Sequence, residues 1–174
     1  GSFSWDKTYR YLIGEKGISP EKVNMGIAFY GRGVVTDGPA SLGAPTKKKD
    51  LVVNPDGPVY RASDIDTWGD KYIEQPNYFF IKQETANWTH LWDDDAKVPY
   101  SVNGSSFISY DNEKSVKYKA DYINDNQLGG VIIWHVTGDW EVGSVTATYG
   151  GKLKKAQVTT PLLDVIYKTF TSNS

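Results

Sequence analysis

The sequence predicts an α/β protein that carries an α+β insertion, and three observations lead to this prediction. A continuous apolar run at residues 128–134 ends in a tryptophan and is typical of a strand buried in a parallel sheet. Segments of helical periodicity alternate with short apolar runs in both end regions of the chain. A long segment rich in turn residues and aromatic side chains separates these regions and breaks the alternation.

The N-terminal region predicts one helix followed by one strand. Tyr9, Leu12 and Ile13 recur at helical spacing within residues 5–17, and Gly17 marks the end of that helix. Residues 23–30 follow a Ser-Pro turn and form a short, mostly apolar run. A helix joined to a strand by a short connection is the usual α/β unit.

The middle of the chain predicts a small antiparallel α+β unit. Residues 34–58 are rich in Gly, Pro, Asp and Lys without a period, which predicts an irregular excursion. A helical pattern follows over residues 60–72. Aromatic-rich and β-branched stretches then predict strands at residues 78–84, 87–92 and 98–102.

The C-terminal region returns to alternating strands and helices. Strands are predicted at residues 106–110 and 128–134, separated by a helix that starts at Asp111 or Asn112. Residues 138–155 are predicted to be a loop. The Thr160-Pro161 pair predicts the start of a final helix, whose apolar stripe comprises Leu162, Val165, Ile166 and Phe170.

Length and charge restrict the class of protein. The 174 residues, 39% hydrophobic and 23% charged, suit one ordinary globular domain. A net charge of -2 argues against nucleic acid or an anionic membrane as partner, because both require a clustered basic surface. The only basic run, Lys47 to Lys49, is interpreted as a solvated loop. No apolar stretch reaches the ~20 residues that a membrane-spanning helix needs.

Metal and cofactor chemistry is not expected. Cysteine is absent, which excludes disulfides, thiolate nucleophiles and cysteine metal sites. His90 and His135 lack the short spacing of a zinc motif, so no metal and no cofactor is predicted. Gly1 and Ser2 have the composition of a tag-cleavage remnant, so the chain is expected to be an excised segment.

Trp134 is the first candidate for a ligand contact. It ends the predicted strand at 128–134, and residues at the carboxyl ends of parallel strands face the active sites of such enzymes. A large flat aromatic side chain there indicates a platform for a ring-shaped ligand, whereas the alternative is a core tryptophan. The high aromatic content of 14% is a further hint of a carbohydrate site, since a sugar's C–H face packs on aromatic rings.

Five segments, taken in order, resemble the glycoside hydrolase family 18 chitinases. They are VNMGIAFYGR at 23–32, WDDDAKVPY at 92–100, FISYD at 107–111, SVKYK at 115–119 and LGGVIIW at 128–134. The resemblance runs from about residue 6 to residue 170. It implies the C-terminal portion of a TIM (β/α)8 barrel with an α+β chitinase insertion domain. The implied divisions are a barrel segment at 3–33 (sixth helix and seventh strand), the insertion at 34–105, and a second barrel segment at 106–174 (seventh helix, eighth strand and eighth helix).

The catalytic signature of that family, Asp-x-x-Asp-x-Asp-x-Glu on the fourth strand, does not occur in this sequence. The nearest acidic clusters, at residues 64–66 and 93–95, lack its spacing and are interpreted as solvated loops. The family's Tyr-Asp pair of the sixth strand is also absent. We therefore predict no catalytic residue in this chain and no activity for the chain alone.

The resemblance implies four substrate-binding residues. Trp134 corresponds to the tryptophan that forms the floor of the sugar subsite at the scissile bond. Trp88 and His90 align with positions where many members carry an aromatic residue and an arginine that contact the sugar. His offers at most two donors where Arg offers five, which alters that contact. Tyr30 is expected to border the cleft.

The resulting hypothesis is the C-terminal part of a chitinase that cleaves β-1,4-linked N-acetylglucosamine polymers by substrate-assisted catalysis. The alternative is a non-catalytic, lectin-like carbohydrate-binding fragment. Expected partners are chitin oligosaccharides, the missing N-terminal barrel segment on the same or a separate chain, and a second copy through exposed strand edges. The family resemblance alone implies an extracellular, secreted location.

Overall fold

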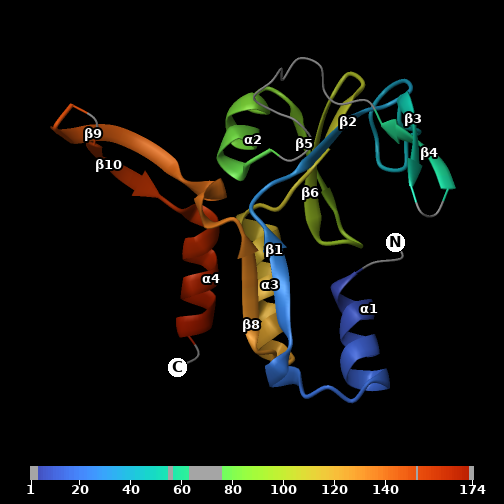
Figure 1. Ribbon diagram of the computed structural model, residues 1–174, viewed down its shortest axis with the longest axis horizontal. Helices are drawn as coiled ribbons and strands as arrows, with labels where there is room; N and C mark the ends of the chain where they lie inside the picture. Colours follow the sequence, from blue (N-terminus) through green and yellow to red (C-terminus); the bar gives the residue numbers. More distant parts are fainter. Residues whose placement is uncertain (1–3, 55–56, 63–75, 152, 173–174) are drawn as a thin grey trace.

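The computed structural model describes residues 4–54, 57–62, 76–151 and 153–172. Its centre is a pair of parallel strands, β1 (Asn24–Ala28) and β8 (Gly130–Trp134), with Ala28 aligned to Trp134. Figure 1 shows them side by side, with helix α3 (Glu113–Asp125) behind them. The two strands confirm the predictions at 23–30 and 128–134, although both are shorter than the apolar runs.

Helices lie at the three places where helical periodicity predicts them outside the insertion. α1 (Trp5–Tyr9) continues without a break into η1 (Arg10–Glu15), a π-helical segment, and η2 (Pro20–Lys22) is a single 3₁₀ turn before β1. The N-cap of α3 is Asn112, the second of the two predicted caps. The final helix, α4 (Pro161–Thr171), has its proline in the first turn as predicted.

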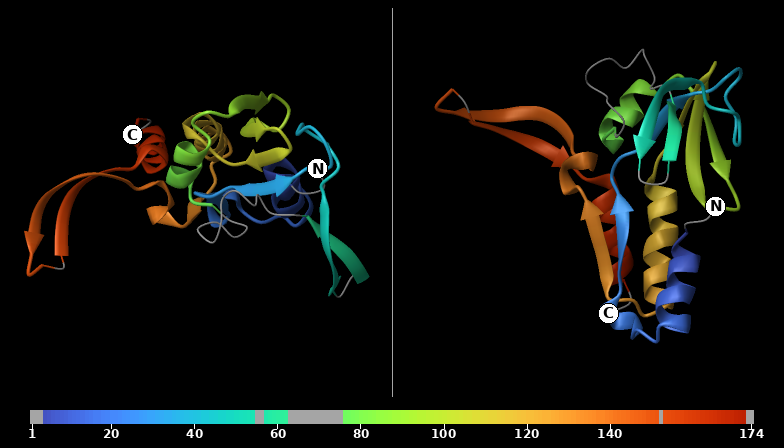
Figure 2. Two further views of the ribbon diagram at one scale, coloured as in Figure 1. Left: turned by 90° about the horizontal axis from the view of Figure 1, so that it is seen from above. Right: turned by 45° about the vertical axis from the view of Figure 1, so that its right-hand side comes forward.

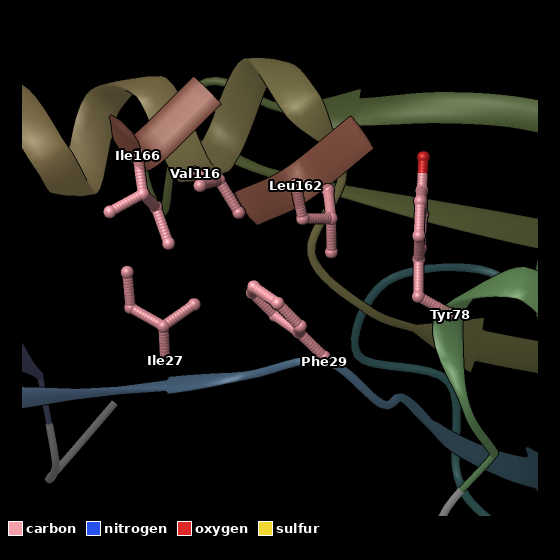
Figure 3. Packing of buried hydrophobic residues seen from close by; sticks show 6 residues of the cluster. All are labelled: Ile27, Phe29, Tyr78, Val116, Leu162 and Ile166. Atoms are coloured by element: carbon pink, nitrogen blue, oxygen red, sulfur yellow. The ribbon is translucent and has the colours of Figure 1, made fainter. Parts of the chain in front are cut away.

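The core lies on one face of the β1–β8 pair. Ile27 and Phe29 point from β1 toward Val116 of α3 and toward Leu162 and Ile166 of α4 (Figure 3). All five are buried, at 4% exposure or less. Side chains alternate along a strand, so the other face of β8 carries the intervening residues. Among the described residues no helix packs on that face, and this asymmetry positions the candidate site.

The segment predicted to be the insertion, together with its two flanks, contains a four-stranded antiparallel sheet. Its order is β2 (Arg32–Val35), β7 (Ser106–Ser109), β6 (Val98–Asn103) and β5 (Thr89–Asp93). The predicted strands at 87–92, 98–102 and 106–110 are thus confirmed. The division at residues 33 and 105 stays a prediction, and the pairing of β2 with β7 joins strands that lie at those two boundaries.

The strand predicted at residues 78–84 is wrong, because this segment is the helix α2 (Tyr78–Glu84). The run of aromatic and β-branched side chains favours a strand by propensity alone. Its buried positions, however, are Tyr78, Ile81 and Thr85, which follow the spacing of one helix face. Tertiary burial therefore overrides the local preference.

Two hairpins correct further predictions. β3 (Lys48–Asn54) pairs with β4 (Gly57–Ala62), so residues 34–58 are not wholly irregular. Lys48 and Lys49 of the basic run lie in β3, whereas Lys47 precedes the strand. The helix predicted over 60–72 is wrong at 60–62, which lie in β4. The remainder of that predicted helix, residues 63–72, lies outside the described residues.

The loop predicted at 138–155 is also wrong. β9 (Glu141–Tyr149) and β10 (Leu153–Thr159) form an antiparallel hairpin that projects away from the body of the molecule (Figures 1 and 2). Gly150 and Gly151 follow β9 with φ of +57° and +70°, a backbone conformation that favours glycine. The Gly-Gly pair between β-branched residues was the signal for this hairpin.

Candidate functional site

Trp134 stands at the carboxyl end of β8 with 68% of its surface exposed. It shares the helix-free face of that strand with Ile132, which is 61% exposed. The backbone N–H of Phe29 donates to the Trp134 carbonyl at 2.9 Å, which fixes the end of the strand. Trp134 is therefore not part of the core that the described residues form.

The segment after Trp134 is anchored by Asp139, which ends the 3₁₀ turn η4 (Val136–Asp139). Its Oδ2 accepts from the backbone N–H groups of Leu162 and Leu163 at 2.9 and 3.0 Å. Asp139 therefore caps α4, whereas Thr160, the predicted cap, makes no side-chain capping bond. Burial raises the pKa of the Asp139 carboxyl, and the two backbone hydrogen bonds oppose that rise.

His135 turns to a local partner. The Trp134–His135 peptide bond is cis, and the His135 ring lies with Nδ1 2.6 Å from the Thr137 hydroxyl. This contact holds the imidazole along the η4 turn. Thr137 is thus one of the residues that shape the chain immediately after the tryptophan.

Tyr30 lies where the chain leaves β1 and where the insertion returns to it. It forms an isolated antiparallel bridge with Asn77, and the next residue, Gly31, donates to the Pro76 carbonyl at 2.8 Å. A Cβ on Gly31 would approach the Ser109 carbonyl oxygen to 2.7 Å, so only glycine fits there. The half-buried Tyr30 is therefore fixed at the junction between the strand pair and the insertion.

His90 belongs to a polar cluster with Ser101 and Tyr110. Its Nδ1 lies 2.8 Å from the buried Ser101 hydroxyl and 3.4 Å from the Tyr110 hydroxyl, and the two hydroxyls are 3.0 Å apart. Burial raises the pKa of Tyr110, while its bond to Ser101 opposes the rise. The cluster thus contacts the Nδ1 edge of the His90 imidazole, and the side chain is otherwise exposed.

Trp88 has a different environment from its neighbour in the predicted pair. It is half-buried and packs against the cluster of Ile81 and Ile108. Of the two residues that were predicted together, His90 is accessible, whereas Trp88 packs against Ile81 and Ile108.

A chain of contacts joins Trp134 to His90. Phe29 bonds the Trp134 carbonyl through its N–H and accepts from the Tyr78 N–H at 2.9 Å through its carbonyl. The Tyr78 ring lies 6.4 Å from that of Tyr110, which contacts His90. Tyr78 and Tyr110 escaped sequence reasoning because their roles depend on α2 and on the approach of two distant segments.

Tyr78 also joins α2 to α3. Its hydroxyl donates to Glu113 Oε2 at 2.6 Å. Burial is the main cause that raises the pKa of the Tyr78 phenol far above the ordinary value, and the Glu113 carboxylate raises it further. The phenol therefore stays neutral and keeps donating across the physiological range.

A cleft of about 620 Å³ lies beside η4, between α2 and the start of β9. None of the four predicted site residues lines it. Sequence reasoning missed it because both of its walls belong to elements that were predicted incorrectly. Its lining residues are Phe79, Lys82, Gln83, Thr137, Trp140, Glu141 and Val142.

Two classes of site find no support in the part of the chain that the structure describes. Within it, no group of three or more His, Asp or Glu side chains is placed to hold a metal ion. In the same residues, no helix has the length and apolarity to cross a membrane.

Comparisons with known proteins place this geometry in a family. The model of glycosyl hydrolases family 18 matches residues 1–139. Chitinase A1 of Niallia circulans is 35% identical over 131 residues, which cover 72% of this chain and 17% of that protein. Chitinase B of Serratia marcescens is 30% identical over 158 residues, covering 84% of this chain and 31% of that protein.

A solved structure agrees with the fold. The group IV chitinase of Ostrinia furnacalis, in complex with allosamidin, superposes with a TM-score of 0.61 at 26% identity. The match covers 98% of this chain and 40% of that one. The chain thus spans less than a third of each of the two curated relatives. The predicted portion of a (β/α)8 barrel is confirmed, and the chain belongs to glycosyl hydrolases family 18.

Proposed function

We propose that this chain is the C-terminal part of a chitinase that hydrolyses β-1,4-linked N-acetylglucosamine polymers, and that it supplies the sugar-holding side of the cleft. One observation carries the proposal: a tryptophan at the carboxyl end of β8 presents 68% of its surface on the helix-free face. Core strands of this kind normally bury both faces, so an exposed indole there requires a ligand or a further segment to cover it.

The mechanism assigns Trp134 a positioning role. In substrate-assisted catalysis the acetamido oxygen of the substrate attacks the anomeric carbon, so the sugar must be held in a distorted, well-oriented state. The indole face packs against the C–H face of the ring. Because the Phe29 N–H holds the Trp134 carbonyl and Asp139 holds the following turn, the platform keeps its orientation as the sugar distorts. The general acid comes from outside this chain.

The other predicted residues take different parts in the proposal. His90, restrained at Nδ1 by Ser101, offers its remaining ring edge to the sugar. Trp88 shapes the wall from beneath, since it packs on the insertion's core. Tyr30 borders the cleft at the junction with the insertion. A secreted location and binding of chitin oligosaccharides complete the proposal.

The test compares hydrolysis of N-acetylchitopentaose by this chain alone and by the longer protein that contains it. We expect no turnover by the chain alone, because its sequence has no Asp-x-x-Asp-x-Asp-x-Glu signature. In the longer protein, we expect Trp134→Ala to lower kcat/KM. Trp92→Ala is the control and should leave kcat/KM unchanged, because the Trp92 ring packs against Lys114, whose Nζ lies 3.7 Å from the ring centroid. If the longer protein binds N-acetylchitopentaose without hydrolysing it, the lectin-like alternative holds and the hydrolase proposal fails. Turnover by the chain alone would contradict the proposal.

A further inference from the structure

The cleft beside η4 has two walls of different origin. Phe79, Lys82 and Gln83 come from α2, and the facing residues come from η4 and the first residues of the β9–β10 hairpin. Its volume of about 620 Å³ falls in the range of roughly 300–1,000 Å³ typical of small-molecule sites. The hairpin lies beyond residue 139, where the match to the family model ends.

An ion pair joins the two walls. Lys82 Nζ donates to Glu141 Oε1, and the Thr159 hydroxyl donates to the other oxygen of the same carboxylate at 3.4 Å. The side chains of Lys82 and Glu141 are 41% and 40% exposed, so the pair is open to the cleft. Because they neutralise one another and the other lining residues are uncharged, the cleft suits a neutral ligand rather than an anion or a cation.

The remaining lining combines aromatic faces with neutral hydrogen-bonding groups. Trp140 is 42% exposed, and Phe79 from the other wall is half-buried. The Gln83 amide and the Thr137 hydroxyl each supply a donor and an acceptor. An aromatic face beside amide and hydroxyl groups matches a sugar, which offers a C–H face and a rim of hydroxyl or acetamido groups.

We propose that this cleft is a second sugar-binding site, which takes a neutral β-1,4-linked N-acetylglucosamine oligosaccharide on Trp140. The inference rests on the proposed function for the class of ligand. Trp140 and Trp134 flank the same η4 turn at the carboxyl end of β8, so both platforms depend on one short segment that Asp139 fastens to α4. The Lys82–Glu141 pair links α2 to the start of the hairpin across this cleft.

The experiment follows the indole N–H signals of the 15N-labelled chain by NMR during titration with N-acetylchitopentaose. Trp134→Phe and Trp140→Phe assign the two signals, and the indole of Trp92, outside the cleft, is the internal reference. We expect a saturable shift of the Trp140 signal that persists in Trp134→Ala. Gln83→Ala should raise the Kd obtained from this shift several-fold. Val145→Ala, on the hairpin but outside the cleft, should leave that Kd unchanged.

The outcomes separate this inference from the proposed function. A Trp140 signal that does not move at the highest sugar concentration overturns the second site, whatever Trp134 does. A Trp134 signal that does not move contradicts the platform instead. Cellopentaose has the same linkage without acetamido groups, and an equal response of Trp140 to it would overturn the assignment to N-acetylglucosamine.

Discussion

Asp139 is the residue whose position the fold fixes most tightly near the platform. It has no exposed surface, its Oδ2 caps α4, and its Oδ1 has no hydrogen-bond partner among the described residues. A charge in this position lacks solvation, which is why burial raises the pKa of the group above its ordinary value of 3.8. Ionisation of Asp139 therefore costs native-state stability through lost solvation, although the two capping hydrogen bonds themselves favour the charged form.

Asp139→Asn tests this account of the cap. The native state binds the Asp139 proton more tightly than the unfolded state, so its contribution is fully present below the ordinary pKa and declines as pH rises through the folded-state pKa. The asparagine variant keeps an acceptor and does not titrate. We expect its unfolding free energy, measured in urea, to rise relative to wild type between about pH 3 and pH 7. Asp125→Asn, at an exposed carboxyl of α3, is the control, and a difference independent of pH would contradict the account.

Single residues of the site differ in how far the sequence predicts them. The exposure of Trp134 follows from strand alternation and from its place at the strand end, both visible in the sequence. The partners of His90 do not, because Ser101 and Tyr110 reach it only after β5 pairs with β6 and after the chain turns from β7 into α3. Which edge of an imidazole is accessible is thus a property of tertiary structure.

At the scale of elements, α3 is the helix with the most complete N-terminus. The Asn112 side chain accepts from the Ser115 N–H at 3.0 Å, and the Ser115 hydroxyl accepts from the Asn112 N–H at 2.9 Å. The Ser115 hydroxyl in turn donates to Asp111 at 2.8 Å, and Asp111 pairs with Lys119. This network fixes the helix directly after Tyr110, a member of the His90 cluster.

Asn112→Ala removes one half of this reciprocal cap. Loss of such a residue costs about 1 kcal/mol of stability. We expect the free energy of urea unfolding to fall by that amount. Ser4→Ala, which removes a single exposed capping bond of 3.2 Å from the short helix α1, should cost below about 0.5 kcal/mol. Equal losses in the two variants would show that the cap network of α3 adds no stability.

The elements also show where sequence patterns fail. The regular strands and helices of the barrel portion are predictable because their periodicity and their burial agree. In α2 the aromatic run indicates a strand while the burial of Tyr78 and Ile81 requires a helix, and the packing against β7 and α3 decides. The β9–β10 hairpin makes most of its contacts within itself, so its sequence carries no strong core pattern to detect. The cleft beside η4 depends on both elements, and the Gly150-Gly151 pair is the one sequence signal that points to either of them.

At the scale of the whole molecule, the parallel strand pair is covered on one face only. Of the described helices, α3 lies behind β1 and β8 (Figure 1), and α3 and α4 both contribute to the core on that face. Ile132 and Trp134, which alternate with the core-facing residues of β8, are exposed. Parallel sheets are almost always buried on both faces. This open face is therefore a surface for the rest of the barrel, for a second copy, or for both in turn.

Self-association follows from this surface. We expect sedimentation velocity of the chain to show an average mass that rises with concentration, because pairing of the open faces removes apolar area from water. Ile132→Ser should reduce the effect. Val145→Ser, at a position 49% exposed on the hairpin, is the matched control. A monomer at every concentration would mean that the open face does not drive association.

The central claim is that Trp134 holds the sugar, and a titration of the chain with N-acetylchitopentaose, followed by tryptophan fluorescence, tests it most directly. If a sugar covers roughly 100 Å² of the indole at ~25 cal/mol per Å², the contact contributes ~2.5 kcal/mol, or roughly 60-fold in Kd. Because the proposed Trp140 site takes the same sugar, every protein in this titration carries Trp140→Phe. In that background the account predicts saturable binding by the parent and by Trp92→Ala, and a Kd weakened by about that factor in Trp134→Ala. An unchanged Kd in Trp134→Ala, or no binding by the parent, would contradict it.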